Sequence, residues 1–185
     1  MSRTSAAAAR ASTSEGLKNH FALLGFAPEY ALDVGKLESA YREIQARIHP
    51  DKFAHAGDAE RRASMQMATR VNEAYRTLRS PVKRAVYLLQ LRGIDVAFET
   101  DTAMPKDFLM EQMELRERLD EAKDPAVLGS IVEDLNAEKK KIEGQIGTSI
   151  DTDKDLEAAR ALVRKLMFFD RLAEEVDEAY QALER

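Results

Sequence analysis

Two amphipathic helical patterns on either side of one proline-containing loop constrain the fold more than any other feature of this 185-residue sequence. In the first pattern, Leu37, Tyr41, Ile44 and Ile48 recur at spacings of four, three and four, which places them on one face of a helix. Pro50 restricts the preceding residue to extended geometry and therefore predicts the end of that helix. A second stripe follows the loop "HPDKFAHAG", so an antiparallel helical hairpin is predicted.

The sequence also predicts where these helices and their neighbour begin and end. Asp33 and Asp58 are candidate N-caps of the two hairpin helices, and Ser80-Pro81 ends the second one. The short apolar run "HFALLGF" supplies a further piece to close the core, and Gly25 is predicted to stop it. The inward stripe of the second hairpin helix is predicted to be Met65, Ala68, Asn72, Tyr75 and Leu78.

The remainder of the chain predicts a connecting helix, a joint and a bundle. The segment "VKRAVYLLQLR" is a short helix stopped by Gly93, and the next dozen residues lack a helical period. Pro105 suits a first helical turn, and Asp124 is a candidate cap with Pro125 just inside the helix. Three long helices with short connections imply a small antiparallel bundle. The predicted helices span residues 105–122, 125–146 and 153–184.

Composition supports an all-α fold made of two modules. Apolar residues make up 44% of the chain and charged residues 33%, with only eight Gly and five Pro, which favours helices over strands. No segment shows the alternation of a strand. The predicted division is a disordered tail at 1–16, a helical hairpin with its connecting helix at 17–92, a linker at 93–104 and a three-helix bundle at 105–185.

The absence of cysteine excludes disulfides, zinc-thiolate sites, cysteine nucleophiles and thiolate ligation of an iron-sulfur cluster. We therefore expect neither a cofactor nor a bound metal. The longest apolar runs are far shorter than the ~20 residues of a membrane span, so we expect no membrane insertion and a cytosolic location. Residues 1–14 carry two Arg and no acid, as organelle transit peptides do, but so short a Ser/Ala run favours a disordered tail.

Charge divides unevenly between the two modules. Residues 1–92 hold 15 Lys and Arg against 9 Asp and Glu, a net charge of +6, whereas residues 93–185 hold 13 against 24, a net charge of −11. Because surface charge steers association, the two modules are predicted to bind different partners.

The loop that carries His49 and Asp51 has three interpretations. The pair can act as a general base and its partner, but no nucleophile, phosphate-binding glycine loop or second carboxylate pair accompanies it. His49 and His55 can offer metal ligands, but their spacing matches no usual metal motif. A polar turn that ends a helix remains the plain alternative. We therefore predict no catalytic residue and no metal site.

A His-Pro-Asp string is expected by chance in a chain this long only about one time in a hundred. Here "YREIQARIHPDKF" followed by "NEAYRTLRSPVKRAVY" resembles the J-domain over about residues 17–80. This resemblance implies a co-chaperone module that docks on the ATPase of a DnaK-type chaperone and stimulates ATP hydrolysis. Ile48 stands where many J-domains have an aromatic residue, so we expect altered packing without loss of function. The docking residues implied are His49, Pro50, Asp51 and Lys52, with Arg42 and Arg47 on the preceding helix.

The bundle carries more apolar surface than its core requires. On the helix at 105–122, Leu109, Met110 and Met113 lie roughly opposite the predicted core stripe, and on the last helix Phe168 projects off the inward stripe. These side chains either form a binding face or pack between the two modules. The core stripe of the first bundle helix is Phe108, Leu115, Leu119 and Ala122; that of the last is Leu162, Leu166, Phe169, Ala173, Val176 and Tyr180.

The segments "FLMEQMELRERLDEAKD" and "VRKLMFFDRL" resemble the C-terminal domain of HscB-type co-chaperones of iron-sulfur cluster assembly, and "RAVYLLQLRG" resembles their connecting helix. This resemblance implies an L-shaped pair of modules whose bundle binds the scaffold protein IscU and delivers it to the DnaK-type ATPase HscA. Met113 stands where leucine is usual. The Cys-pair extension of eukaryotic relatives is lacking, which favours a bacterial cytoplasmic protein. The scaffold contacts implied are Leu109, Met110, Met113, Glu114, Glu117 and Phe168.

The function predicted from the sequence is that of a non-enzymatic adaptor that regulates a partner ATPase. A J-domain co-chaperone with another client is the main alternative. A nucleic-acid binder would use the basic module, but the chain lacks an aromatic-basic platform and its net charge is −5. A hydrolase is the weakest alternative.

Overall fold

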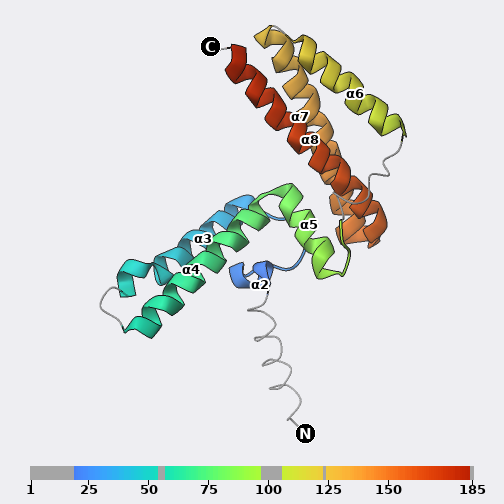
Figure 1. Ribbon diagram of the computed structural model, residues 1–185. Coiled ribbons are helices and arrows are strands. Elements are labelled where there is room, and N and C mark those ends of the chain that lie inside the picture. Colours follow the sequence, from blue (N-terminus) through green and yellow to red (C-terminus); the bar gives the residue numbers. More distant parts are fainter. Residues whose placement is uncertain (1–18, 54–56, 97–105, 123, 184–185) are drawn as a thin grey trace. The chain divides into compact units, whose positions relative to one another are not determined.

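The computed structural model describes residues 19–53, 57–96, 106–122 and 124–183, and every regular element within these ranges is helical (Figure 1). The predicted all-α fold class is confirmed. None of the described helices is long and apolar enough to cross a membrane. The elements are α2 (His20–Leu24), α3 (Val34–Ile48), the 3-10 turn η1 (Pro50–Phe53), α4 (Asp58–Arg79), α5 (Pro81–Leu91), α6 (Lys106–Glu121), α7 (Pro125–Gly147), the π-helix η2 (Thr148–Asp153) and α8 (Leu156–Leu183).

Contacts gather into two compact units that divide between Leu88 and Leu89. The L-shaped arrangement and the predicted module boundaries stay predictions. The first unit contains the hairpin of α3 and α4 with α2 against it (Figure 1). The second contains α6, α7 and α8.

The hairpin closes around side chains that are fully buried. Leu37 of α3 and Val71, Ala74 and Leu78 of α4 have no exposed surface, and the ring of Tyr41 stacks on Tyr75 with centroids 4.1 Å apart. Burying such apolar side chains is the main favourable term in folding. The hairpin predicted from the two stripes is therefore present.

The stripe predicted for α4 was partly wrong. Met65 is 59% exposed, and Ser64 takes the buried position beside it. The buried side chains are Ser64, Val71, Ala74 and Leu78, at spacings of seven, three and four, so the packed face is rotated from the predicted one. The prediction placed Met65 inside because it is apolar. A helix with few apolar residues does not show clearly which of its faces is buried.

The helix ends follow local chemistry. Gly25 ends α2 in the left-handed conformation at φ 81°, as predicted, and Asp124 caps α7 by accepting from the N–H of Ala126 at 2.8 Å. The predicted cap Asp58 is instead the first residue of α4, and Gly57 occupies the cap without a side-chain bond. Asp58 pairs with Arg61 there, where its charge also complements the helix dipole.

α5 is joined to the first unit by aromatic and charged contacts. Tyr87 stacks on His20 with centroids 4.4 Å apart, and its hydroxyl accepts from the backbone N–H of His20 at 3.0 Å. Burial lowers the pKa of His20, because desolvation disfavours the charged imidazole. Buried Arg84 donates to the carbonyl of Leu78 at 2.6 Å and lies 4.9 Å from the ring centroid of Tyr30.

In the second unit α7 and α8 form an antiparallel pair. The hydroxyl of Tyr180, near the end of α8, donates to the carbonyl of Pro125 at the start of α7 at 3.2 Å. The core between them is apolar, and α6 contacts α8 through Phe108 and its neighbours. The buried apolar side chains of the pair are Leu128, Ile131, Leu135, Ile142 and Ile146 from α7, with Ala159, Val163, Leu166, Phe168, Phe169, Leu172 and Val176 from α8.

The predicted break after residue 146 takes a different form. α7 continues to Gly147 and passes directly into the π-helix η2, which buries Ser149 and Ile150. The guanidinium of Arg92, just after α5, donates to the carbonyl of Ile150 at 3.0 Å. The last carbonyl groups of a helix need donors from elsewhere, and Arg92 supplies one to Ile150 near the end of η2. α8 then begins at Leu156, three residues later than predicted.

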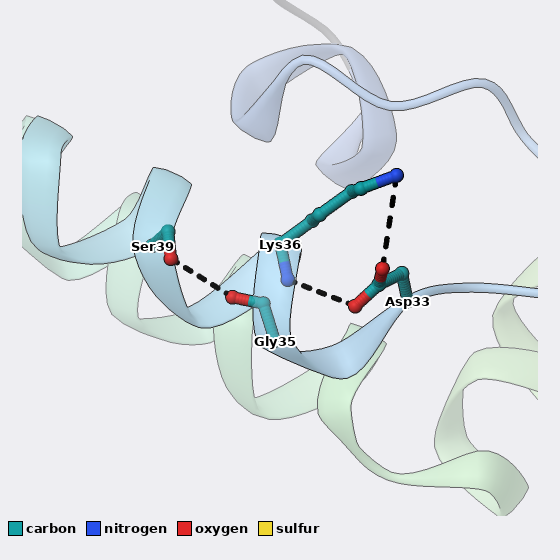
Figure 2. A network of polar contacts seen from close by, with 4 residues as sticks. All are labelled: Asp33, Gly35, Lys36 and Ser39. Carbon is teal, nitrogen blue, oxygen red and sulfur yellow. Dashed lines mark hydrogen bonds and ion pairs between the residues drawn. The ribbon is translucent and has the colours of Figure 1, made fainter.

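The cap of α3 leads to a test by substitution. Asp33 accepts from the N–H of Lys36 at 3.0 Å, whereas exposed Ser39 donates to the carbonyl of Gly35 inside the same helix (Figure 2). We expect Asp33→Ala to lower the Tm, because an N–H of the first turn loses its acceptor. Asp33→Asn should retain the cap. Ser39→Ala is the matched control and should not lower the Tm, since alanine favours helix.

The same cap sets a pH dependence. The backbone N–H of Lys36 lowers the pKa of Asp33, so the stabilisation is fully present above the usual Asp pKa and is lost as pH falls through the lowered one. We therefore expect the Tm difference between the wild type and Asp33→Ala to shrink in acid. Circular dichroism melts from neutral to acidic pH measure this, and equal Tm values at neutral pH would show that the cap contributes nothing.

Candidate functional site

The hairpin turns at a short rigid segment between α3 and α4. His49 is the C-cap of α3 at φ −55° and ψ 129°, as the proline after it requires. Pro50–Phe53 then form one 3-10 turn, in which the N–H of Lys52 donates to the carbonyl of His49 at 3.0 Å. The chain therefore presents the His-Pro-Asp string on hydrogen-bonded backbone.

His49 and Asp51 lie side by side at this tip. The Nδ1 atom of His49 accepts from the backbone N–H of Asp51 at 3.3 Å, and it lies 3.4 Å from the side-chain Oδ2 of Asp51. A neutral His49 that accepts at Nδ1 carries its proton on Nε2. The Asp51 side chain is 90% exposed. The tip thus offers a carboxylate and a directional N–H to a partner in solvent.

The predicted basic residues around the tip are all exposed but differ in their contacts. Arg42 pairs with Glu38, and Arg47 lies 3.7 Å from Glu43, each one helical turn away on α3. Lys52 is exposed in the 3-10 turn. Exposed pairs of this kind are worth little individually, so both guanidinium groups can exchange their partners for a carboxylate of another protein at small cost.

One contact that supports the tip was missed by the sequence analysis. The hydroxyl of buried Ser64 on α4 donates to the carbonyl of Ile48 at 2.7 Å. Ile48 is the last residue of α3, whose carbonyl has no partner within the helix. A buried serine hydroxyl needs a hydrogen-bond acceptor. That requirement is the feature of the sequence from which this contact could have been predicted.

The metal interpretation of the loop finds no support in the part of the chain that the structure describes. No three His, Asp or Glu side chains gather there in a way that could hold a metal ion. His55, the second candidate ligand, lies outside the described residues.

The second candidate site is an apolar face on α6. Leu109, Met110 and Met113 are 42%, 62% and 63% exposed, and Glu117 is exposed beside them. Side chains of this size rarely gather in solvent without a partner. Leu109, Met110 and Met113 together are called the α6 face below.

Phe168 does not project as the sequence analysis predicted. It is only 6% exposed and packs edge-on against Phe108 and Phe169, with centroids 5.5 Å away in both cases. Arg116 covers it, with the guanidinium 5.5 Å from the ring centroid and 3.3 Å from Glu175. The prediction failed because α8 contacts both α6 and α7, so its buried stripe is wider than one helix contact requires.

Glu114 is exposed one helical turn after Met110, at the edge of the α6 face. It lines a groove of about 430 Å³ among α6, α7 and α8, together with Arg118 and Asp134, which are paired at 3.1 Å. Helical geometry alone placed Glu114 at the edge of the α6 face. Arg116 is the residue that the sequence analysis missed, although it follows Met113 by one turn.

The buried position of Phe168 predicts a large loss of stability on truncation. Phe168→Ala should lower the free energy of unfolding by about 3–5 kcal/mol, because it leaves a cavity in the aromatic cluster. Met110→Ala, at an exposed site on the neighbouring helix, should change it by less than about 0.5 kcal/mol. Urea unfolding followed by circular dichroism measures both, and equal values would contradict the burial of Phe168.

Two family models match the chain in separate regions. Residues 19–87 match the DnaJ domain, and residues 104–177 match the HSCB C-terminal oligomerisation domain. The first range contains the hairpin with its His-Pro-Asp tip, and the second contains α6 with the α6 face, α7 and most of α8.

Proteins similar over nearly the whole chain agree with this division. The chain is 47% identical to the co-chaperone protein HscB homolog of Burkholderia multivorans, over 90% of this chain and 96% of that protein. It is 48% identical to the homolog of Cupriavidus taiwanensis, over 89% and 94%.

Solved structures agree in fold. Chaperone HscB from Vibrio cholerae superposes with a TM-score of 0.79 at 35% identity, covering 89% of this chain and 99% of that one. The human co-chaperone protein HscB gives 0.82 at 32% identity, covering 86% and 80%. From these matches and the two family models, the chain belongs to the HscB family of J-domain co-chaperones, which act in iron-sulfur cluster assembly.

Proposed function

We propose that the protein binds the scaffold IscU through the α6 face, binds the DnaK-type chaperone HscA through the His49-Pro50-Asp51 tip, and stimulates ATP hydrolysis by HscA. The observation that carries the proposal is the exposure of two surfaces of different chemistry, one in each unit. Family membership supports a chaperone partner and a scaffold partner in general.

The tip suits a charged partner because its geometry is set before binding. The proline and the 3-10 turn reduce the conformational entropy lost on docking. Asp51 can make a charge-assisted hydrogen bond to an arginine of HscA. Arg42, Arg47 and Lys52 are the cations that we assign to an acidic surface of the same partner.

The α6 face suits an apolar partner with a polar rim. Methionine side chains adapt their shape to a partner surface, and Leu109 adds a branched side chain between them and the helix start. Glu117, Arg116 and Glu114 surround this centre with charge, which is the usual anatomy of an interface. We assign Phe168 a supporting role, since it packs beneath Arg116 and holds α6 against α8.

The proposed mechanism needs no chemistry on this chain. Holding IscU and HscA at once raises the local concentration of the scaffold at the chaperone. If both ligands favour the same state of HscA, their binding is coupled and biases the ATPase toward hydrolysis. We therefore assign the protein as a regulator of a partner ATPase, without a cofactor of its own. We also assign it to the bacterial cytoplasm.

The ATPase of HscA with and without IscU tests the proposal directly. The wild type should stimulate hydrolysis, and IscU should increase the stimulation more than additively. His49→Gln should abolish stimulation, because the directional N–H and its contact with Asp51 are altered, while IscU affinity stays the same. Leu109→Ala with Met113→Ala should weaken IscU binding about 10-fold to 100-fold and leave stimulation without IscU intact.

Controls separate this proposal from its alternative. Phe168→Ala is unsuitable as a binding probe because it removes core packing. Met65→Ala, at an exposed methionine of α4, should change neither activity. Loss of both activities in either folded variant would contradict the division between units. Stimulation of HscA without IscU binding would instead indicate a J-domain co-chaperone with another client.

The support that Ser64 gives to the tip predicts a separate effect. Ser64→Ala removes the donor to the Ile48 carbonyl, so we expect about fivefold more protein to be needed for half-maximal ATPase stimulation, the equivalent of one hydrogen bond. IscU affinity should not change. Thr69→Ala is the matched control, since its hydroxyl bonds to the carbonyl of Met65 within α4 itself. Equal effects in both variants would show that the Ile48 contact has no special role.

A further inference from the structure

The α6 face is built largely from oxidisable side chains. Two of its three members, Met110 and Met113, are thioethers one helical turn apart, and they are the most exposed large apolar residues in the described part of the chain. Met67 and Met167 are partly buried. Met65 on α4 is comparably exposed at 59% but lies in the other unit.

We propose that Met110 and Met113 are a modification site, at which oxidation by peroxide to methionine sulfoxide switches off binding of the scaffold. This inference rests on the proposed function of the α6 face. It assigns a regulation to that same site and leaves the His-Pro-Asp tip unaffected.

The chemistry requires an accessible sulfur and a two-electron oxidant, for which hydrogen peroxide is the simplest source. The sulfur lone pair attacks one peroxide oxygen, the O–O bond breaks and an S–O bond forms. The departing oxygen leaves with both hydrogens as water, so each thioether and one peroxide give one sulfoxide and one water. Susceptibility follows exposure, which places Met110 and Met113 ahead of Met67 and Met167.

The product is unsuited to the contact that the thioethers make. A sulfoxide is polar and carries a strong acceptor oxygen, and burying it without a donor is unfavourable. One turn from Met113 the helix offers Leu109, Met110, Glu117 and Arg116. Only Arg116 can donate, and it is already held by Glu175 and the ring of Phe168. Met110 has Lys106 one turn before it, so the larger loss is assigned to Met113.

The experiment treats the full-length protein with hydrogen peroxide, removes the oxidant and maps the added oxygen by peptide mass spectrometry. Affinity for IscU is then measured by calorimetry. Among the methionines that the structure describes, we expect Met110, Met113 and Met65 to be oxidised first, and we expect IscU affinity to fall about 10-fold or more. Treatment with both stereospecific methionine sulfoxide reductases should restore the affinity. Circular dichroism checks that the treated protein stays folded.

Two variants identify the residues responsible. Met110→Leu with Met113→Leu removes both sulfurs of the α6 face. Each protein is compared with its own untreated form, so that any change in basal affinity is divided out. We expect this variant to keep its own affinity after peroxide. Met65→Leu is the matched control and should lose as much affinity as the wild type, because Met65 is outside the α6 face.

The outcomes separate this inference from the proposed function. If untreated wild type does not bind IscU, the proposed function itself is wrong. If untreated protein binds and protein oxidised at both positions binds equally well, the switch is refuted while the function stands. A loss in the double leucine variant equal to that in the wild type would also refute it, because damage elsewhere would then be the cause.

Discussion

The apolar contact between α3 and α4 is the interaction on which the geometry of the hairpin tip depends. Leu37, Val71, Ala74 and Leu78 are removed from water completely, and this burial holds α3 against α4, while Pro50 sets the end of α3 at Ile48. Only then can Ser64 reach the carbonyl of Ile48 at 2.7 Å. The exposed side chains of His49 and Asp51 are thus oriented by a core to which they do not belong.

In the second unit, buried aromatic side chains likewise lie beside an exposed surface. Phe108, Phe168 and Phe169 meet edge-on with centroids 5.5 to 5.9 Å apart. This geometry stabilises the unit beyond what the burial of the three rings contributes. Phe108 is the member of this cluster that α6 contributes, whereas Leu109, Met110 and Met113 of the same helix are exposed to solvent. A helix with apolar side chains on two sides buries one side in its own unit, and the other, exposed side indicates a binding partner.

The sequence could predict features that depend on neighbours along the chain, and it failed where the third dimension decides. Gly25 and Asp124 act through bonds within one turn, so their roles were readable. The burial of Phe168 depends on a third helix lying across α8, and the hydroxyl of Ser64 acts on a residue sixteen positions away. The periodicity of a single helix reveals neither of these contacts. Met65 shows the complementary error, since hydrophobicity alone placed an exposed side chain in the core.

The two surfaces also differ in what can weaken them, which follows from their chemistry. Contacts made by Asp51, Arg42 and Arg47 are between exposed charges and are screened by salt. Contacts made by the α6 face are apolar, and salt leaves them largely intact, but its two thioethers can be oxidised. Ionic strength therefore acts on the proposed chaperone contact and peroxide acts on the proposed scaffold contact. An adaptor whose two halves rely on different forces can have either attachment weakened while the other persists.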